Sequence, residues 1–171
     1  DIEDVAKVVL KLDDFTAVQA LRPLAVSAAL NRVLNDELWK AHIDADRIGG
    51  FGASMGGETM LLLGGARLTV TTSVIGGDWE FDSKRVTYDS RIKAAAGYVP
   101  YFGQSFLPAF GEDQEGLTGI NLPFLGISGT ADTTAPITEA LIGMRRLTGT
   151  RRLVALSGVE HGFDDAFTND I

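Results

Sequence analysis

The stretch from 49 to 57, Gly-Gly-Phe-Gly-Ala-Ser-Met-Gly-Gly, constrains the fold of this chain more than any other part of the sequence. Its centre matches the pattern G-x-S-x-G, a sharp turn from a strand into a helix that is called the nucleophile elbow. The serine of such a turn, here Ser54, has a strained backbone, and the glycines two residues before and after it let strand and helix approach closely. The pattern predicts a short strand that starts near 46–48 and a helix over about 55–65, with the serine hydroxyl exposed between them.

A glycine-rich turn that merely joins a strand to a helix would have the same composition, and a five-residue pattern often occurs by chance. The apolar strand expected before the turn and the helix expected after it favour the elbow. A phosphate-binding loop fits less well, because no Gly-Lys-Ser or Gly-Lys-Thr follows the glycines.

Short apolar runs without alternation predict strands that are buried on both faces. Besides the elbow strand, such runs occupy 92–99, 122–129 and 152–156. Helical spacing of apolar residues predicts helices over about 22–38, with Pro23 in the first turn, and over 138–147. Because helices lie between most of the strands, we expect an α/β fold with a mainly parallel sheet built from right-handed βαβ units.

Residues 67–121 have a weaker pattern, and we expect them to contain lid or pocket segments. The loop-rich part of this stretch, 103–121, holds several glycines. The length of 171 residues is enough for one domain with a sizeable core, so we treat 1–171 as a single domain.

A serine nucleophile needs a base, and the chain has two histidines, His42 and His161. His42 precedes the elbow strand and falls at the amino end of the predicted sheet. His161 follows the last predicted strand and falls at the carboxyl end, where parallel sheets place their reactive groups. His161 is therefore the candidate base, although a surface-loop residue would have the same sequence context.

A third group should orient the base, and Asp132 follows the third predicted strand in Gly-Thr-Ala-Asp. The order Ser54, Asp132, His161 is the order that a G-x-S-x-G enzyme uses. Asp132 also suits the N-cap of a helix that starts near Pro136, and the two roles are compatible. Three other acids are close to the base in the sequence: Glu160, Asp164 and Asp165. They are weaker candidates, because one adjoins the base and the others follow it.

These residues together predict covalent catalysis. Ser54 would attack an ester or related carbonyl, His161 would take the hydroxyl proton and return it to the leaving group, and Asp132 would hold the imidazole. The backbone N–H of Met55, at a helix N-terminus, would be one donor of an oxyanion hole. This chemistry calls for no metal or cofactor. His42, Asp44 and Asp46 are close in sequence, but their spacing on a loop is weak support for a metal site.

Composition limits the partners. The formal net charge of −8 argues against nucleic acid or an anionic membrane surface. The absence of cysteine excludes disulfides and a thiol nucleophile without choosing a compartment. No apolar run reaches the length of a membrane span. Because the first residue is Asp1, we expect a processed or trimmed product, so any targeting segment would already be gone.

The chain resembles the α/β-hydrolases, and more narrowly the bacterial dienelactone-hydrolase-like and platelet-activating-factor-acetylhydrolase-like esterases. The matching stretches are 22–23, 46–49, 52–57, 89–94, 126–132 and 160–163. The resemblance implies an α/β-hydrolase fold and a serine esterase with lipase-like chemistry. Ala53 stands where many relatives carry a histidine. This difference bears on which substrate the enzyme would accept and not on the identity of the nucleophile.

The resemblance also implies that strands are missing, because such enzymes have several strands before the helix that starts here near Arg22. One of the preceding loops supplies the second oxyanion donor. We expect this chain to be the C-terminal part of the fold, with residues 1–20 as a nicked loop. A separate N-terminal polypeptide of the same precursor would complete the sheet and cover its exposed edge.

The leading hypothesis is thus a serine hydrolase that acts on a small-molecule carboxylic ester. A peptidase or an acyl-transferase on the same scaffold would use the same three side chains. A non-catalytic fragment or binding module that has kept the fold is the alternative from another class.

Overall fold

A computed structural model describes residues 12–68, 87–105 and 107–162 of the chain. The chain divides between Ile43 and Asp44 into two compact units, which we describe separately. Much of the expected lid or pocket segment, 69–86, lies outside the described residues. Within the described ranges, no helix is both long enough and apolar enough to cross a bilayer.

The first unit contains the helix α2, Leu12–Asn35, and a short 3-10 helix η1, Lys40–His42. The predicted helix over 22–38 is present, but it starts well before Arg22 and ends at Asn35. The prediction that Pro23 occupies a first helical turn is wrong, because this proline lies inside α2. The preceding residues, Leu-Asp-Asp-Phe-Thr-Ala-Val-Gln-Ala-Leu, include good helix formers, so the helix continues through a position that lacks a backbone N–H.

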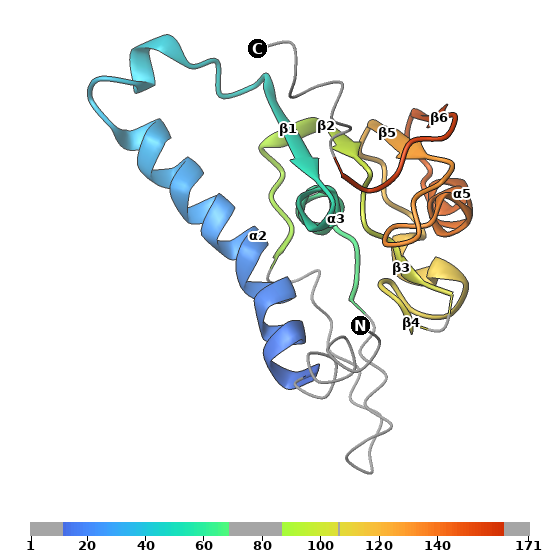
Figure 1. The fold of residues 1–171 in the computed structure, drawn as a ribbon. Coiled ribbons are helices and arrows are strands. Elements are labelled where there is room, and N and C mark those ends of the chain that lie inside the picture. The colour runs from blue at the N-terminus through green and yellow to red at the C-terminus, as the bar shows by residue number, and fades with distance from the viewer. Residues whose placement is uncertain (1–11, 69–86, 106, 163–171) are drawn as a thin grey trace. The chain divides into compact units, whose positions relative to one another are not determined.

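The second unit is built on a four-stranded sheet in the order β1-β2-β5-β6 (Figure 1). The strands are β1 (Ile48–Ala53), β2 (Ile92–Tyr98), β5 (Phe124–Gly129) and β6 (Arg151–Leu156). All neighbouring pairs are parallel, as predicted. The helices α3 (Met55–Leu63) and α5 (Ile137–Arg146) follow β1 and β5, so the α/β class and the βαβ organisation are confirmed.

One face of the sheet is packed closely against α3 and α5. A Cβ atom on Gly50 would lie 2.3 Å from the sulfur of Met60 in α3. Gly126 lies on the same face by strand register, and its Cβ would meet Leu153 at 2.9 Å and the sulfur of Met144 in α5 at 3.7 Å. Gly50 therefore lets α3 approach the sheet, whereas at Gly126 the close neighbour is Leu153 of β6. Three leucines of α3, residues 61–63, have no exposed surface.

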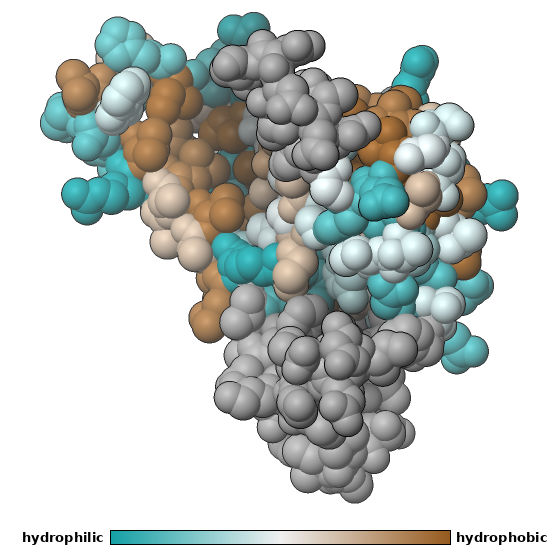
Figure 2. Space-filling model, in the orientation of Figure 1, coloured by the Kyte–Doolittle hydropathy of each residue, from teal (hydrophilic) through white to brown (hydrophobic). Residues whose placement is uncertain are grey.

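The opposite face of the sheet, called the open face below, carries partly exposed side chains among the described residues. Strand register aligns Phe51, Ala96, Leu125 and Arg152 in one row across the sheet. The side chain of Phe51 is 68% exposed, and the apolar residues of β5 and β6 on this face are also partly exposed. Hydrophobic residues gather at the surface over β5 and β6 in Figure 2. The prediction that the strands are buried on both faces is therefore wrong for this face.

The loop-rich stretch after β2 contains more regular structure than the sequence predicted. A two-stranded antiparallel sheet is formed by β3 (Gly103–Gln104) and β4 (Leu107–Pro108), and the 3-10 helix η2 spans Glu112–Leu117. Gln114 is fully buried in η2, and its amide donates to the carbonyl of Phe102 at 2.7 Å and to the carboxylate of Glu139 in α5 at 3.0 Å. These bonds fix the segment that enters β3 to the first turns of α5.

A backbone hydrogen bond joins the end of α3 to the turn before β2, and a part-buried ion pair lies in the same turn. The backbone N–H of Asp89 donates to the Leu63 carbonyl, and its carboxylate accepts the Nε of Arg91 at 2.8 Å and an Nη atom at 2.5 Å. The hydrogen bonds that Arg91 donates to Asp89 raise the pKa of the guanidinium. The Asp89 side chain is 7% exposed, so water does not replace this partner readily.

We predict that Asp89→Ala lowers the free energy of unfolding by about 1.5–3 kcal/mol, because it removes charge-assisted hydrogen bonds from a largely buried site. Urea denaturation followed by circular dichroism measures this change. Asp44→Ala is the matched control, since Asp44 pairs with Arg47 while both side chains are largely exposed, and we expect a change within about 0.5 kcal/mol. Equal effects of the two substitutions would contradict the prediction.

Candidate active site

Ser54 lies between β1 and α3 in a backbone conformation that is unusual for a residue other than glycine. Its φ of 53° and ψ of −120° confirm the strain expected of the elbow. The surrounding backbone holds this conformation in place. The Ser54 N–H donates to the Tyr98 carbonyl at 2.9 Å, and its own carbonyl accepts the N–H groups of Gly57, Glu58 and Tyr101 at 2.9, 3.3 and 3.0 Å.

The glycines around the serine have different roles from those predicted. A Cβ on Gly52 would lie 2.2 Å from the backbone of Gly56, so this glycine is required for the close approach of strand and helix. No atom lies within 4 Å of a Cβ built on Gly56, so the expectation that this position must lack bulk is wrong. Gly57 is the crowded one, because its Cβ would lie 2.6 Å from the ring of Pro100.

Asp132 lies in the turn after β5, and its side chain has no exposed surface. One carboxylate oxygen, Oδ1, accepts the backbone N–H groups of Thr134 at 2.8 Å and Ala135 at 2.7 Å. The alternative role as a helix N-cap is wrong, since α5 has Pro136 at its N-cap. Asp132 instead closes the turn that precedes the helix, and this leaves its second oxygen for another partner.

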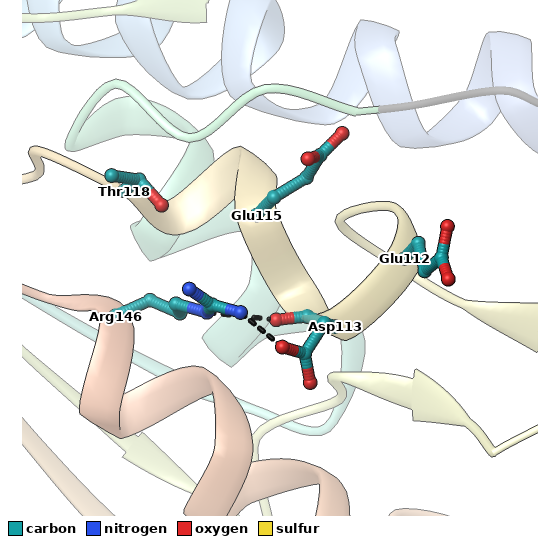
Figure 3. Close-up of a pocket in the computed structure, with 5 residues that line it drawn as sticks. All are labelled: Glu112, Asp113, Glu115, Thr118 and Arg146. Carbon is teal, nitrogen blue, oxygen red and sulfur yellow. Dashed lines mark hydrogen bonds and ion pairs between the residues drawn. The ribbon is translucent and has the colours of Figure 1, made fainter.

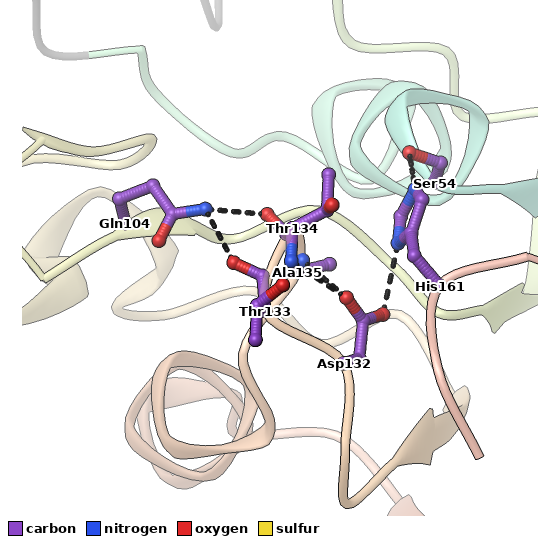
Figure 4. A network of polar contacts seen from close by, with 7 residues as sticks. All are labelled: Ser54, Gln104, Asp132, Thr133, Thr134, Ala135 and His161. Carbon is purple, nitrogen blue, oxygen red and sulfur yellow. Dashed lines mark hydrogen bonds and ion pairs between the residues drawn. The ribbon is translucent and has the colours of Figure 1, made fainter. Parts of the chain in front are cut away.

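His161 follows β6 and lies between the other two side chains (Figure 4). Its Nδ1 is 2.8 Å from Asp132 Oδ2, and its Nε2 is 2.9 Å from Ser54 Oγ. An ionised carboxylate can only accept hydrogen bonds, so Nδ1 carries the proton and Nε2 is left to accept the serine hydroxyl. The structure thus brings together Ser54, Asp132 and His161, three predicted residues that are far apart in sequence.

The loops that carry the acid and the base are joined by backbone hydrogen bonds. The N–H of Ala131 donates to the Val159 carbonyl at 3.0 Å, and the N–H of Gly158 donates to the hydroxyl of Thr130 at 2.9 Å. A Cβ on Gly129 would lie 2.1 Å from the same Val159 carbonyl, so the loops also approach closely. The pairing of β5 with β6 therefore continues into the segments that hold Asp132 and His161.

The other sequence candidates are elsewhere. His42 is exposed in η1, in the first unit of the chain. Glu160 is exposed beside His161, and the remaining two rival acids, at 164 and 165, lie outside the described residues. Among the described residues, no group of three or more histidine, aspartate or glutamate side chains is arranged to hold a metal ion.

A buried acid lies one turn beyond the serine. Glu58 in α3 has no exposed surface. Burial raises the pKa of the Tyr101 phenol, and the negative charge of Glu58 raises it further. The backbone N–H of Tyr101 donates to the Ser54 carbonyl, so a neutral tyrosine ring and a buried acid both adjoin the elbow. No sequence pattern pointed to either residue.

A surface hollow is lined by residues of η2 and α5 and by Thr118 (Figure 3). Its lining includes Glu112, Glu115 and the pair Asp113–Arg146, in which the Arg146 Nε donates to the Asp113 carbonyl at 2.9 Å. None of the three residues at the strand ends lines it. The charged lining suits a solvated surface feature and not an acyl-binding pocket.

Comparison with solved structures identifies the fold. An alpha-beta serine hydrolase homologue from Coxiella burnetii matches with a TM-score of 0.51 and 20% identity, over 84% of this chain and 51% of that chain. An acetyl ester-xyloside bifunctional hydrolase from Caldicellulosiruptor lactoaceticus matches with a TM-score of 0.51 and 17% identity, over 77% of this chain and 53% of that chain. No protein-family model and no curated protein matches the sequence.

These likenesses show an α/β-hydrolase fold, as the sequence resemblance implied. The chain spans about half the length of the solved structures it matches.

We predict that Ser54→Gly gives a more stable protein than Ser54→Ala, by roughly 1 kcal/mol, because glycine alone adopts a φ of 53° without strain. The order is the reverse of that at an ordinary helix or strand position. Thermal unfolding of the two variants measures it, and neither carries a hydroxyl that would complicate the comparison. A more stable alanine variant would contradict the strain at this residue.

Proposed function

We propose that this chain carries the catalytic residues of a serine hydrolase that cleaves carboxylic esters. The observation that supports the proposal best is the hydrogen-bonded path from Ser54 Oγ through both nitrogens of His161 to Asp132 Oδ2. A general base must lie within hydrogen-bond reach of the proton that it removes, and both distances meet that requirement. The position of all three groups beyond strand carboxyl ends supports the same function.

The proposed reaction has two stages. His161 Nε2 takes the hydroxyl proton as Ser54 Oγ bonds to the ester carbonyl carbon, and the proton then passes to the departing alcohol. The acyl group remains on Ser54 until a water molecule, activated by the same nitrogen, attacks it. Asp132 keeps the Nδ1 proton in place and stabilises the imidazolium cation that exists in both stages.

The negative charge of the tetrahedral intermediate needs hydrogen-bond donors. We assign one of them to the Met55 backbone N–H, because Met55 is the first residue of α3 and directly follows the serine. Loss of one such donor costs roughly 3 kcal/mol in comparable sites. The second donor would come from a loop before β1 in the sequence of the complete fold.

The substrate class rests on the chemistry and on one solved structure. A Ser-His-Asp site also serves peptidases and acyl-transferases, so the triad alone does not separate them. The Caldicellulosiruptor lactoaceticus protein is called an acetyl ester-xyloside bifunctional hydrolase, and its acetyl ester activity favours an ester substrate here as well. Residues 67–121 remain our proposal for the lid or pocket walls.

We predict that a fluorophosphonate probe labels Ser54 in the full-length protein and that nitrophenyl acetate is hydrolysed. His161→Ala should lower kcat at least about 10,000-fold, because the serine then has no base. The matched control is His42→Ala, which removes the other histidine and should leave kcat unchanged. Absence of labelling at Ser54 would exclude catalysis and favour a binding module, and turnover of amides but not esters would favour a peptidase.

We also propose that a separate N-terminal polypeptide of the same precursor completes the sheet. Among the described strands, β1 pairs only with β2, so one of its edges has no strand beside it. On the open face, Phe51 is 68% exposed, and the apolar side chains of Leu125 and Val154 are 37% and 43% exposed. An apolar face beside an unpaired edge is typical of a surface that another segment covers. This chain covers about half of each matched hydrolase, which supports a further segment of the fold.

We predict that Phe51→Lys abolishes co-purification of this polypeptide, because a charge on the covered face opposes burial. Intact mass spectrometry of the purified protein measures it. Leu141→Lys is the control, because Leu141 is 43% exposed on α5, and α5 covers the opposite face of the sheet. This variant should still co-purify with the partner. An active, folded 18.2 kDa species alone, or one longer chain that carries both parts, would contradict the proposal.

A further inference from the structure

We propose that Gln104 is a positioning residue that fixes the carboxylate of Asp132 through two peptide groups. Both side chains are hydrogen-bonded to the peptide groups of the turn after β5, which lie between them (Figure 4). This inference rests on the proposed function and adds a residue that neither the sequence pattern nor the triad geometry identifies.

The carboxamide of Gln104 is bonded to two backbone carbonyls. Its Nε2 donates to the Thr133 carbonyl at 3.1 Å and to the Thr134 carbonyl at 2.6 Å. A primary amide nitrogen carries two N–H donors, so both are used. No other glutamine lies in β3 or in the turn that holds Asp132.

The same two peptide groups bind Asp132 on their other side. The Thr133 carbonyl and the Thr134 N–H belong to one peptide group, and the Thr134 carbonyl and the Ala135 N–H belong to the next. Both of these N–H groups donate to Asp132 Oδ1, at 2.8 and 2.7 Å. In a trans peptide group the C=O and the N–H point in opposite directions, so each group lies between Gln104 and the carboxylate.

This arrangement restricts the rotation of both peptide planes. In each peptide group the C=O accepts from Gln104 and the N–H donates to Asp132. The peptide group therefore cannot rotate without breaking both hydrogen bonds. Each hydrogen bond also polarises the next along such a chain, which strengthens the N–H donors that hold Oδ1. With Oδ1 fixed, the orientation of Oδ2, the oxygen that receives His161 Nδ1, is fixed as well.

The backbone around Gln104 is held in place by strand pairing and hydrogen bonds. It pairs with Leu107 across the small sheet of β3 and β4. Two residues earlier, the Phe102 carbonyl accepts the Ala109 N–H at 2.9 Å and the Gln114 amide at 2.7 Å. The Gln114 amide also reaches Glu139 in α5, so the base of β3 is tied to the helix that follows the Asp132 turn.

The test compares near-isosteric variants in the full-length protein. Gln104→Met keeps the length of the side chain and removes both donors, and we expect kcat to fall about tenfold with KM changed by less than twofold. Gln104→Glu places a carboxylate opposite two carbonyls, and we expect a fall of about 100-fold. Ser105→Ala, in the neighbouring exposed position, is the control and should match the unaltered protein.

A second readout separates positioning from a general loss of stability. The Nδ1 proton of His161 should give a downfield proton resonance that disappears in His161→Ala. We expect this resonance to move upfield in Gln104→Met and Gln104→Glu, and to stay in place in Ser105→Ala. Unchanged kcat and an unchanged resonance in both Gln104 variants would overturn the inference. So would a fall in activity with the resonance unchanged.

The failure of this inference is distinguishable from failure of the proposed function. If Ser54→Ala abolishes hydrolysis and the Gln104 variants behave like the unaltered protein, only the role of Gln104 is wrong. If Ser54→Ala retains hydrolysis, the proposed function itself is wrong, and the inference falls with it.

Discussion

The buried carboxylate of Asp132 is the constraint on which the rest of the site depends. A charged group with no exposed side-chain surface is costly to bury unless hydrogen-bond donors of the protein replace water. Two peptide N–H groups and the imidazole of His161 supply those donors. The turn after β5 must therefore keep one conformation, and the loop after β6 must place its histidine within reach.

The strained turn at Ser54 belongs to the same arrangement. Its conformation persists because three N–H groups converge on the serine carbonyl, one of them from Tyr101 beyond the end of β2. Val99, between Tyr98 and Pro100, also has a positive φ, of 41°. Unfavourable backbone conformations thus occur at the carboxyl ends of two adjacent strands, where they are stabilised by surrounding contacts and face the site.

The sequence predicted the α/β class, the four parallel strands and the α3 and α5 helices because each rests on a local pattern of apolar residues. It also predicted the meeting of Ser54 with Asp132 and His161, since the topology sends all three to one sheet edge. It missed the extension of α2 through Pro23, where the propensity of neighbouring residues outweighs one absent N–H. It also predicted that Gly56 must lack a side chain, whereas the glycine in close contact with another residue is Gly57, which packs against Pro100. Contacts such as that one, or those of Gln104, join residues distant in sequence, and no local pattern encodes them.

The bonds between the loops after β5 and β6 have a consequence for motion in the site. Because Ala131 is hydrogen-bonded to Val159 and Gly158 to Thr130, the loops that carry the acid and the base are held to each other. Ser54 follows β1, and β2 lies between β1 and β5 in the sheet. A shift of β1 against β5 would therefore change the gap between Ser54 Oγ and His161 Nε2 more than the gap between His161 Nδ1 and Asp132 Oδ2.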